Sequence, residues 1–276
     1  MSISTIGRYE VETELTQGGM GVIFLARDPY IQRQVVVKVL MFKHTMDDVY
    51  REFFQREAEV IAALEHPCIV PIYDFGWHGQ QPYIVMRYMS GGSLDDRLQK
   101  GEIKLTEMAH ILKRVAEALD AAHAGKIIHR DIKPSNILFD STGEAFLSDF
   151  GIAKSQTIAD DEGEWLVGTP AYMSPEQVKG DHVDGRSDIY ALGVTLYRLL
   201  SGRLPFASAS TTALINMHVE LPIPDIRQVK ANVPAVWQEV VAKAMAKDPN
   251  DRYSTASDFA RDVTEVVSGK WYLRKL

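Results

Sequence analysis

The apolar residues of this chain change their spacing near Gly91, and that change limits the possible folds more than any other feature. Before Gly91, apolar runs rich in β-branched residues predict strands, at 35–42 (VVVKVLMF), 68–76 (CIVPIYDFG) and 81–89 (QPYIVMRYM). After Gly91, long stretches have the 3.6-residue spacing of helices. We therefore expect an α+β protein, with a small β-rich part followed by a larger, mainly helical part.

A single helix is predicted within the first part, over 46–67 (MDDVYREFFQREAEVIAALEHP). Asp47 or Asp48 can cap its start, and His66-Pro67 is expected to end it. Its apolar residues recur at roughly helical spacing, at Val49, Phe53, Val60, Ile61 and Leu64.

Several helices are predicted in the second part. TEMAHILKRVAEALDAAHAGK, at 106–126, is expected to be a long amphipathic helix that Thr106 caps and Gly125 ends. GRSDIYALGVTLYRLLSG, at 185–202, is apolar on nearly all sides and should be buried. Further helices are expected around 234–246 and 255–267.

The composition fits one large domain or two lobes. The chain has 276 residues, of which 46% are hydrophobic and 24% charged. A short connector is expected at 87–92, and a cleft between two lobes is a favoured place for a ligand. The net charge of -7 argues against a nucleic-acid partner, which usually needs clustered Lys and Arg.

Several features of the sequence bear on location. Cys68 is the single cysteine, which excludes an intrachain disulfide and fits a reducing compartment. The longest apolar stretch, 189–200, is too short to span a bilayer and is interrupted by Gly193 and Arg198. The start of the chain lacks the pattern of a secretory signal. We predict a cytoplasmic chain without a membrane segment, with the cytoplasmic domain of a longer, membrane-anchored protein as the alternative.

The stretch LTQGGMGV, at 15–22, contains three glycines, Gly18, Gly19 and Gly21. Glycines let a backbone turn sharply and approach a ligand closely. The stretch is compatible with a loop that cradles phosphates and with an ordinary hairpin turn. A phosphate-loop pattern would place a glycine where Thr16 stands.

Two central segments gather the residue types that phosphoryl transfer needs. IIHRDIKPSNILFD, at 127–140, contains Asp131, Lys133 and Asn136, and AFLSDFGIAK, at 145–154, contains Asp149. Phosphoryl transfer uses hard oxygen ligands for a metal ion, a carboxylate that orients the attacking hydroxyl, and lysines that neutralise charge. Each motif alone is also compatible with a turn or with polar surface residues, but all of them in this order make coincidence a poor explanation.

The chain resembles a eukaryotic-type (Hanks-type) Ser/Thr protein kinase catalytic domain, in the style of the bacterial members. The resemblance runs from about Tyr9 to about Val267 and rests on TQGGMG, VVVK, FQREAE, HRDIKPSN, DFG and SPE. It implies a bilobal kinase fold with a small antiparallel β-rich N-lobe at 9–86 that carries one helix. A hinge at 87–90 and a larger helical C-lobe at 91–267 follow, with a tail at 268–276.

The resemblance also implies which residues bind ATP. Lys38 is expected to bind the α/β-phosphates and to pair with Glu57, whereas Glu59 faces the other side of its helix. The phosphates should lie under the glycine loop, at Gly18, Gly19, Gly21 and Val22. The adenine should contact Val36, Met86, Arg87 and Met89. Asp96 is compatible with a contact to the ribose or the peptide, and with an ordinary acid at a helix start.

The chemistry is assigned by the same resemblance. Asp131 is expected to act as catalytic base, Lys133 to contact the γ-phosphate, and Thr169 to touch both and help seat the peptide. Asn136 and Asp149 are expected to hold Mg²⁺, with Mn²⁺ as an alternative. The implied reaction transfers the γ-phosphoryl group of ATP to Ser or Thr hydroxyls of proteins, including the kinase itself.

Other residues resemble structural positions of the family. Glu176 should pair with Arg252, and Asp188 should anchor the base of an apolar column formed by Ile61, Ile72, His129 and Phe150. The expected activation loop, 149–176, contains the hydroxyls of Ser155 and Thr157 and four acids, Asp160, Asp161, Glu162 and Glu164. The acids are compatible with a solvated loop, or with a carboxylate that pairs with Arg130 in place of a phosphate.

Three positions depart from the family pattern, at Thr16, Val36 and Arg87, and none of them is a catalytic group. A pseudokinase that only binds ATP is the main alternative, although Lys38, Asp131 and Asp149 are all present. A small-molecule kinase of related fold would lack the GTPAYMSPE segment that the chain has. Dimerisation through the small lobe is suggested only by analogy with bacterial relatives.

Overall fold

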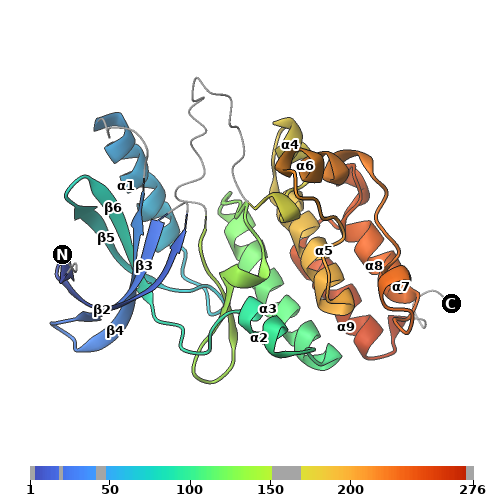
Figure 1. Cartoon of the computed structure of the whole chain (residues 1–276), viewed down its shortest axis with the longest axis horizontal. Coiled ribbons are helices and arrows are strands. Elements are labelled where there is room, and N and C mark those ends of the chain that lie inside the picture. Colours follow the sequence, from blue (N-terminus) through green and yellow to red (C-terminus); the bar gives the residue numbers. More distant parts are fainter. Residues whose placement is uncertain (1–3, 19–20, 42–47, 151–168, 272–276) are drawn as a thin grey trace. The chain divides into compact units, whose positions relative to one another are not determined.

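The computed structural model describes residues 4–18, 21–41, 48–150 and 169–271, with the side chains of 48–50 left out. The chain divides into two compact units, Met1–Ser90 and Gly91–Leu276 (Figure 1). The first unit contains a sheet and one helix, and the second is mainly helical. The α+β fold with a β-rich first part is therefore confirmed.

The first unit is built on a six-stranded antiparallel sheet with the strand order β1-β2-β3-β4-β6-β5. Its strands are β1 Thr5–Ile6, β2 Tyr9–Gly18, β3 Gly21–Asp28, β4 Arg33–Leu40, β5 Ile72–His78 and β6 Gln81–Arg87. Strands β4 and β6 agree with the predicted runs, whereas β5 begins later than the predicted 68–76. One core cluster of the unit includes Ile6, Tyr9, Val37 and Val85.

Helix α1, Asp48–Ala62, packs against this sheet. The Phe54 ring lies edge-on to Phe75 and Trp77 of β5, at centroid distances of 6.4 and 5.4 Å. The helix starts within the predicted window but ends at Ala62, before the predicted stop at His66-Pro67.

The second unit contains eight of the described helices and a two-stranded hairpin (Figure 1). The helices are α2 Leu94–Lys100, α3 Leu105–Ala124, α4 Pro175–Lys179, α5 Gly185–Ser201, α6 Thr211–Glu220, α7 Ile226–Val229, α8 Val236–Ala244 and α9 Ala256–Val267. The hairpin pairs β7 Ile137–Phe139 with β8 Ala145–Leu147. Helix α3 packs on α9, where the Asp120 carboxylate accepts hydrogen bonds from the backbone N–H groups of Ala256 and Ser257, each at 2.9 Å.

Helix α5 is the buried helix that the sequence predicts. Asp184 caps its start, Gly202 ends it in the left-handed conformation, and α3, α8 and α9 all contact it. Gly193 allows α8 to approach closely, because a Cβ there would lie 2.9 Å from the Cβ of Ala244. Helices α8 and α9 also lie where they were predicted.

The predicted cap of the long helix is wrong. Helix α3 begins at Leu105, and Lys104 occupies the N-cap position without a side-chain hydrogen bond. Lys104 has an extended backbone, with φ -63° and ψ 143°, so the helix already includes Thr106 in its first turn. Gly125 is the C-cap, as predicted.

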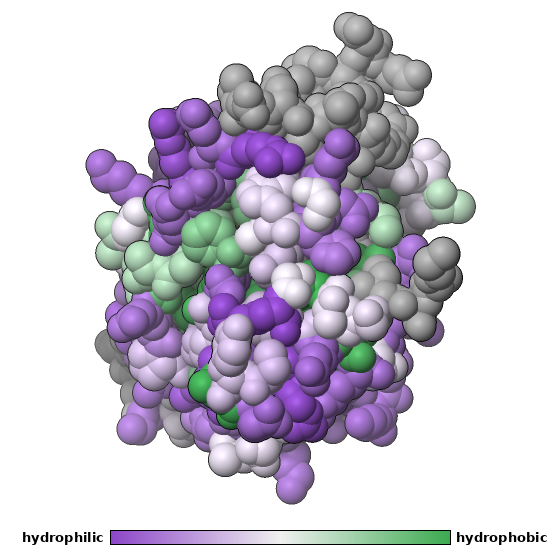
Figure 2. Space-filling view, turned by 90° about the vertical axis from the view of Figure 1, so that its left-hand side faces the viewer, coloured by the Kyte–Doolittle hydropathy of each residue, from purple (hydrophilic) through white to green (hydrophobic). Residues whose placement is uncertain are grey.

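The surface gives two further observations. Across the described residues, every helix lacks the length or the apolar character that a membrane span requires. Figure 2 shows a face that is mostly hydrophilic with smaller apolar areas. The large apolar side chains exposed in the first unit include Leu15, Tyr30, Ile31, Met41, Val60 and Tyr73.

Candidate functional site

The buried carboxylate of Asp188 on α5 anchors the backbone of the loop that carries Asp131. Asp188 accepts hydrogen bonds from the backbone N–H groups of His129, at 2.9 Å, and Arg130, at 2.8 Å. His129 is fully buried, and its Nε2 lies 2.8 Å from the carbonyl oxygen of Ser148. Arg130 has a φ of 64°, a conformation that costs energy in a residue other than glycine. The predicted anchoring by Asp188 is confirmed.

The Asp131 carboxylate lies at the centre of a dense polar cluster and is only 6% exposed. Its Oδ1 accepts hydrogen bonds from Thr169, from the backbone N–H at 3.1 Å and from the hydroxyl at 3.0 Å. Its Oδ2 lies 3.0 Å from Lys133 Nζ, which also donates to Thr169 Oγ1 at 2.6 Å. The predicted contacts of Thr169 with Asp131 and Lys133 are therefore confirmed.

The Asn136 side chain is oriented by the same cluster. Its Nδ2 donates to the Asp131 carbonyl at 2.8 Å and to Asp131 Oδ2 at 3.1 Å. Because both bonds engage the nitrogen, the amide oxygen is kept as an acceptor. Ser148 donates to the Asn136 carbonyl through its backbone N–H, at 2.9 Å, and through its hydroxyl, at 3.0 Å.

Asp149 lies at the same end of the β7–β8 hairpin as Asn136. Asn136 directly precedes β7, and Asp149 follows Ser148 at the end of the antiparallel strand β8. Asp149 has a φ of 62°, a second strained position beside the cluster. The hairpin register thus brings the backbones of Asn136 and Asp149 to the same end of the two strands.

The side-chain oxygens of Asn136 and Asp149 match the ligands of a hard cation. Mg²⁺ is usually held by one or two protein oxygens, with phosphates and water completing its shell. Among the described residues, no group of three or more His, Cys, Asp or Glu side chains could hold a metal ion on its own. The donor set of Asn136 and Asp149 therefore fits a metal that arrives with a phosphate ligand better than it fits a closed structural site.

In the first unit, Lys38 and Glu57 both occupy half-buried positions. Lys38 lies on β4, opposite Ile23 of β3 and Ile84 of β6. Glu57 lies within the helix stripe of Phe54, Ala58 and Ile61, which are all buried. Their pairing stays a prediction.

Glu59 faces away from that stripe. It is exposed, and its Oε1 accepts a hydrogen bond from Gln55 at 2.9 Å. The sequence-based choice of Glu57 over Glu59 for the inner face of the helix is confirmed.

Two glycines of the stretch lie at strand ends: Gly18 is the last residue of β2 and pairs with Gly21, the first residue of β3. Gly21 has a φ of 150°, and a Cβ there would collide with the carbonyl oxygen of Val39. Thr16 is an exposed strand residue opposite Ile23, and Val22 is buried. Gly19 lies outside the described residues.

The residues predicted around the adenine lie on two neighbouring strands and just beyond them. Val36 of β4 pairs with Met86 of β6, and the Arg87 backbone N–H donates to the Pro71 carbonyl at 3.0 Å. Met86 and Met89 are 8% and 6% exposed. Contacts with adenine stay predictions.

Asp96 is the N3 residue of helix α2 and completes the capping box with the N-cap residue Ser93. Its Oδ2 accepts hydrogen bonds from the Ser93 backbone, at 2.8 Å, and from the Ser93 hydroxyl, at 2.7 Å, in a reciprocal capping box. These hydrogen bonds lower the pKa of Asp96. The structure thus gives Asp96 a capping role, and a contact with ribose or peptide stays a prediction.

The apolar column is described in part. In the second unit, the His129 and Phe150 rings are packed with their centroids 4.7 Å apart. In the first unit, Ile61 is buried and Ile72 is half-buried. The predicted acids and hydroxyls of 151–168 lie outside the described residues, and Arg130 Nε is buried without a hydrogen-bond partner within the described part.

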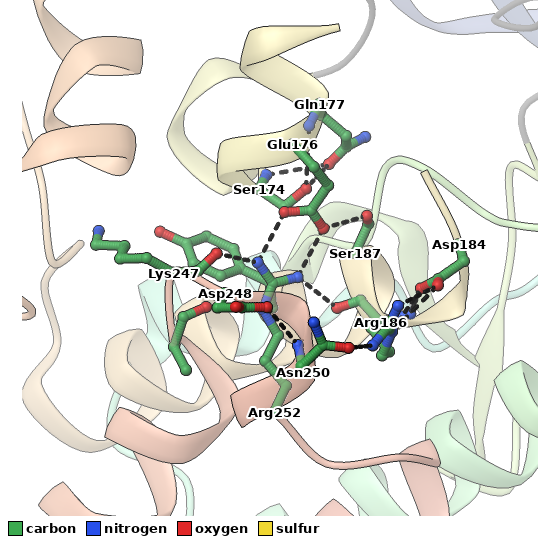
Figure 3. A network of polar contacts seen from close by, with 12 residues as sticks. Ser174, Glu176, Gln177, Asp184, Arg186, Ser187, Lys247, Asp248, Asn250 and Arg252 are labelled. Atoms are coloured by element: carbon green, nitrogen blue, oxygen red, sulfur yellow. Dashed lines mark hydrogen bonds and ion pairs between the residues drawn. The ribbon is translucent and has the colours of Figure 1, made fainter. Parts of the chain in front are cut away.

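Arg252 forms the predicted ion pair with Glu176, at the centre of a network that Figure 3 shows. The sequence did not indicate the other members of this network. Ser187 also donates to Glu176, and Arg252 donates to the backbone carbonyls of Arg186, Ala246 and Lys247. Because every residue has a backbone carbonyl, the sequence does not indicate which carbonyls accept hydrogen bonds from Arg252.

Comparison with known proteins decides the family. The model of the protein kinase domain matches residues 9–271. The chain belongs to the protein kinase domain family. This kinase domain is 38% identical over 261 residues to the serine/threonine-protein kinase PrkC of Bacillus subtilis, covering 93% of the chain and 40% of PrkC. It is 41% identical over 273 residues to PknB of Mycobacterium leprae, covering 95% of the chain and 43% of PknB.

A solved structure supports the same fold. The PknI kinase domain of Mycobacterium tuberculosis superposes with a TM-score of 0.79 at 31% identity, covering 96% of this kinase domain and 99% of that chain. The kinase domain spans less than half the length of the curated relatives it matches, 40% of PrkC and 45% of PknH of Mycobacterium bovis. Proteins of this family use ATP and a divalent metal ion.

Proposed function

We propose that this kinase domain transfers the γ-phosphoryl group of ATP to Ser and Thr hydroxyls of protein substrates, including its own. The observation that carries the proposal is the cluster in which Lys133 and Thr169 both contact the buried Asp131 carboxylate. The named Ser/Thr kinases PrkC and PknB, which are 38% and 41% identical, support the choice of a protein hydroxyl as the acceptor.

The Asp131 carboxylate orients the attacking hydroxyl and accepts its proton at a carboxylate oxygen. Its hydrogen bonds with Thr169 and Asn136 fix the plane of the carboxylate before substrate arrives. Lys133 Nζ supplies positive charge next to the transferring group. Burial of the cluster strengthens each of these interactions, because water does not compete with them.

Asn136 and Asp149 hold the metal, for which we propose Mg²⁺ with Mn²⁺ as a substitute. A bound metal neutralises charge on the β- and γ-phosphates and helps to orient them. The hydrogen bonds from Asn136 Nδ2 to Asp131 tie the metal ligand to the catalytic base. The segment from Asp131 to Asn136 and the hairpin that follows it thus position both parts of the chemistry.

The first unit supplies the remaining contacts with ATP. Lys38, paired with Glu57, binds the α/β-phosphates, and the turn from Gly18 to Val22 covers the phosphates. Val36, Met86, Arg87 and Met89 bind the adenine. From the second unit, Asp96 on α2 contributes to ribose or peptide binding. We take 9–86 as the N-lobe, 87–90 as the hinge and 91–267 as the C-lobe of one catalytic domain. The cytoplasmic location and the homodimer stay predictions.

The test is transfer of labelled phosphate from ATP and Mg²⁺ to the protein itself and to myelin basic protein. We expect label on Ser or Thr with the wild type, and a loss of at least about 10²-fold with Asp131→Asn. Asp225→Asn, which changes the half-buried carboxylate that caps α7, is the matched control and should keep full activity. Melting temperatures confirm that each variant is folded. A folded wild type that binds ATP and transfers no phosphate would establish the pseudokinase instead.

A further inference from the structure

Arg198 of α5 joins two segments that are far apart in the sequence. Its Nη1 donates a hydrogen bond to the Tyr172 hydroxyl at 2.8 Å, and its Nη2 lies 2.7 Å from Asp95 Oδ1. The Arg198 and Asp95 side chains are 26% and 27% exposed, so the pair is shielded on most sides. A charge-assisted contact of this length in a partly buried setting is stronger than an ordinary surface pair.

Tyr172 ends the same short turn that Thr169 begins. The turn is the 3-10 helix Pro170–Tyr172, and the Tyr172 backbone N–H donates to the Thr169 carbonyl at 2.9 Å. Thr169 in turn contacts Asp131 and Lys133. Arg198 therefore fixes one end of a turn whose other end contacts the catalytic carboxylate.

Asp95 gives Arg198 a rigid support on its other side. It lies in the first turn of α2, whose cap Ser93 forms a backbone bridge with Leu138 of β7. Strand β7 directly follows the loop that carries Asn136. The contact thus links the Thr169 turn back to the hairpin that holds the metal ligands.

We propose that Arg198 is a positioning residue that holds the Thr169–Tyr172 turn in the conformation that seats the protein substrate. Arg198 itself does not touch the reacting atoms. It acts through the Tyr172 hydroxyl, with Asp95 fixing its guanidinium. The inference rests on the proposed function, because the turn seats a peptide only if the chain phosphorylates one.

The chain offers a matched control for this role. Arg227 forms an equally close pair with Asp225, with Nη2 and Oδ2 2.5 Å apart, but both residues belong to the start of α7. That pair joins no distant segments. Arg227→Ala removes the same chemical group as Arg198→Ala without releasing the turn.

The experiment compares Arg198→Ala, Tyr172→Phe, their double variant and Arg227→Ala. Hydrogen exchange of the backbone amides of 171–174 reports order in the turn and needs no activity. Initial rates give KM for myelin basic protein and, separately, KM for ATP. We expect Arg198→Ala and Tyr172→Phe each to speed exchange and to raise the protein KM about tenfold, with the ATP KM unchanged.

The double variant tests whether the two residues act together. If Arg198 works through the Tyr172 hydroxyl, the double variant is no worse than the more affected single variant. The proposal would be overturned if Arg198→Ala had the same hydrogen-exchange rates and the same KM for myelin basic protein as the wild type. Additive effects of the two substitutions in the double variant would also overturn it. A wild type without phosphate transfer would refute the proposed function instead, while the exchange data would still decide whether Arg198 orders the turn.

Discussion

Arg252 holds Glu176 through two parallel hydrogen bonds, from Nη1 to Oε1 at 2.6 Å and from Nη2 to Oε2 at 2.7 Å. The Arg252 side chain is fully buried and that of Glu176 is 6% exposed. Burial alone would raise the pKa of the Glu176 carboxyl, yet the hydrogen bonds from Arg252 and Ser187 hold it below its usual value. The carboxylate is therefore kept charged by its partners.

Removal of one partner of this pair should destabilise the fold. We expect Arg252→Ala to lower the free energy of unfolding by about 3–5 kcal/mol, because it leaves the Glu176 charge buried without compensation. Arg227→Ala, which removes a partly exposed pair at the start of α7, should change it by less than about 1 kcal/mol. Urea unfolding followed by circular dichroism measures both. Unchanged unfolding together with lost phosphate transfer would contradict this structural role.

His218 predicts a specific dependence of stability on pH. Burial, together with the nearby charge of Lys247, lowers the pKa of His218 to about 4, while Tyr190 and Phe206 pack against its ring. Because the folded pKa lies below the unfolded value, neutral His218 contributes stability above pH 6.5. That contribution is lost as the pH falls toward 4.

The matched variant is His218→Gln, which keeps an acceptor for the Tyr190 hydroxyl. Between pH 7 and pH 4, the wild type should lose up to roughly 3 kcal/mol more stability than this variant. Chemical unfolding at a series of pH values gives the two curves. Parallel curves would show that His218 does not titrate in this way.

Two substitutions of Thr169 distinguish the role of its hydroxyl from the role of its volume. Thr169→Val removes the Oγ1 hydrogen bonds to Asp131 and Lys133 but keeps the volume. We expect it to lower kcat by about 10–100-fold, because Asp131 loses a group that orients it. Thr169→Ser keeps the hydroxyl and should retain most of the rate. Steady-state assays on myelin basic protein compare the two, and equal rates would argue against this role.

The features that the sequence predicted correctly are those encoded by residues close together in the chain. His129, Asp131, Asn136 and Asp149 lie in two short, contiguous motifs, and helix α5 is apolar all round. The sequence therefore predicted the buried anchor of the site and the contacts of Thr169 with Asp131 and Lys133, whereas the catalytic and metal-binding roles stay predictions.

The missed features depend on contacts between distant residues. The contact of Arg198 with Asp95 and Tyr172 spans α2, α5 and the segment after 168, and no sequence spacing predicts it. The start of α3 at Leu105 was missed because the backbone of Lys104, rather than a side-chain cap, begins the helix. Propensity is a weak guide wherever tertiary contacts set the conformation.

Substitutions at Thr16 and Gly21 should differ in their effect on ATP binding. Thr16→Gly changes an exposed strand residue, so we expect the ATP KM to change by less than about threefold and stability to fall by about 0.5–1 kcal/mol. Gly21→Ala must place a Cβ against the Val39 carbonyl at a φ of 150°, and should cost about 1–3 kcal/mol and raise the ATP KM. Initial rates at varied ATP and thermal unfolding measure both variants. A rise of several orders of magnitude in kcat for Thr16→Gly would show that Thr16 impairs the loop.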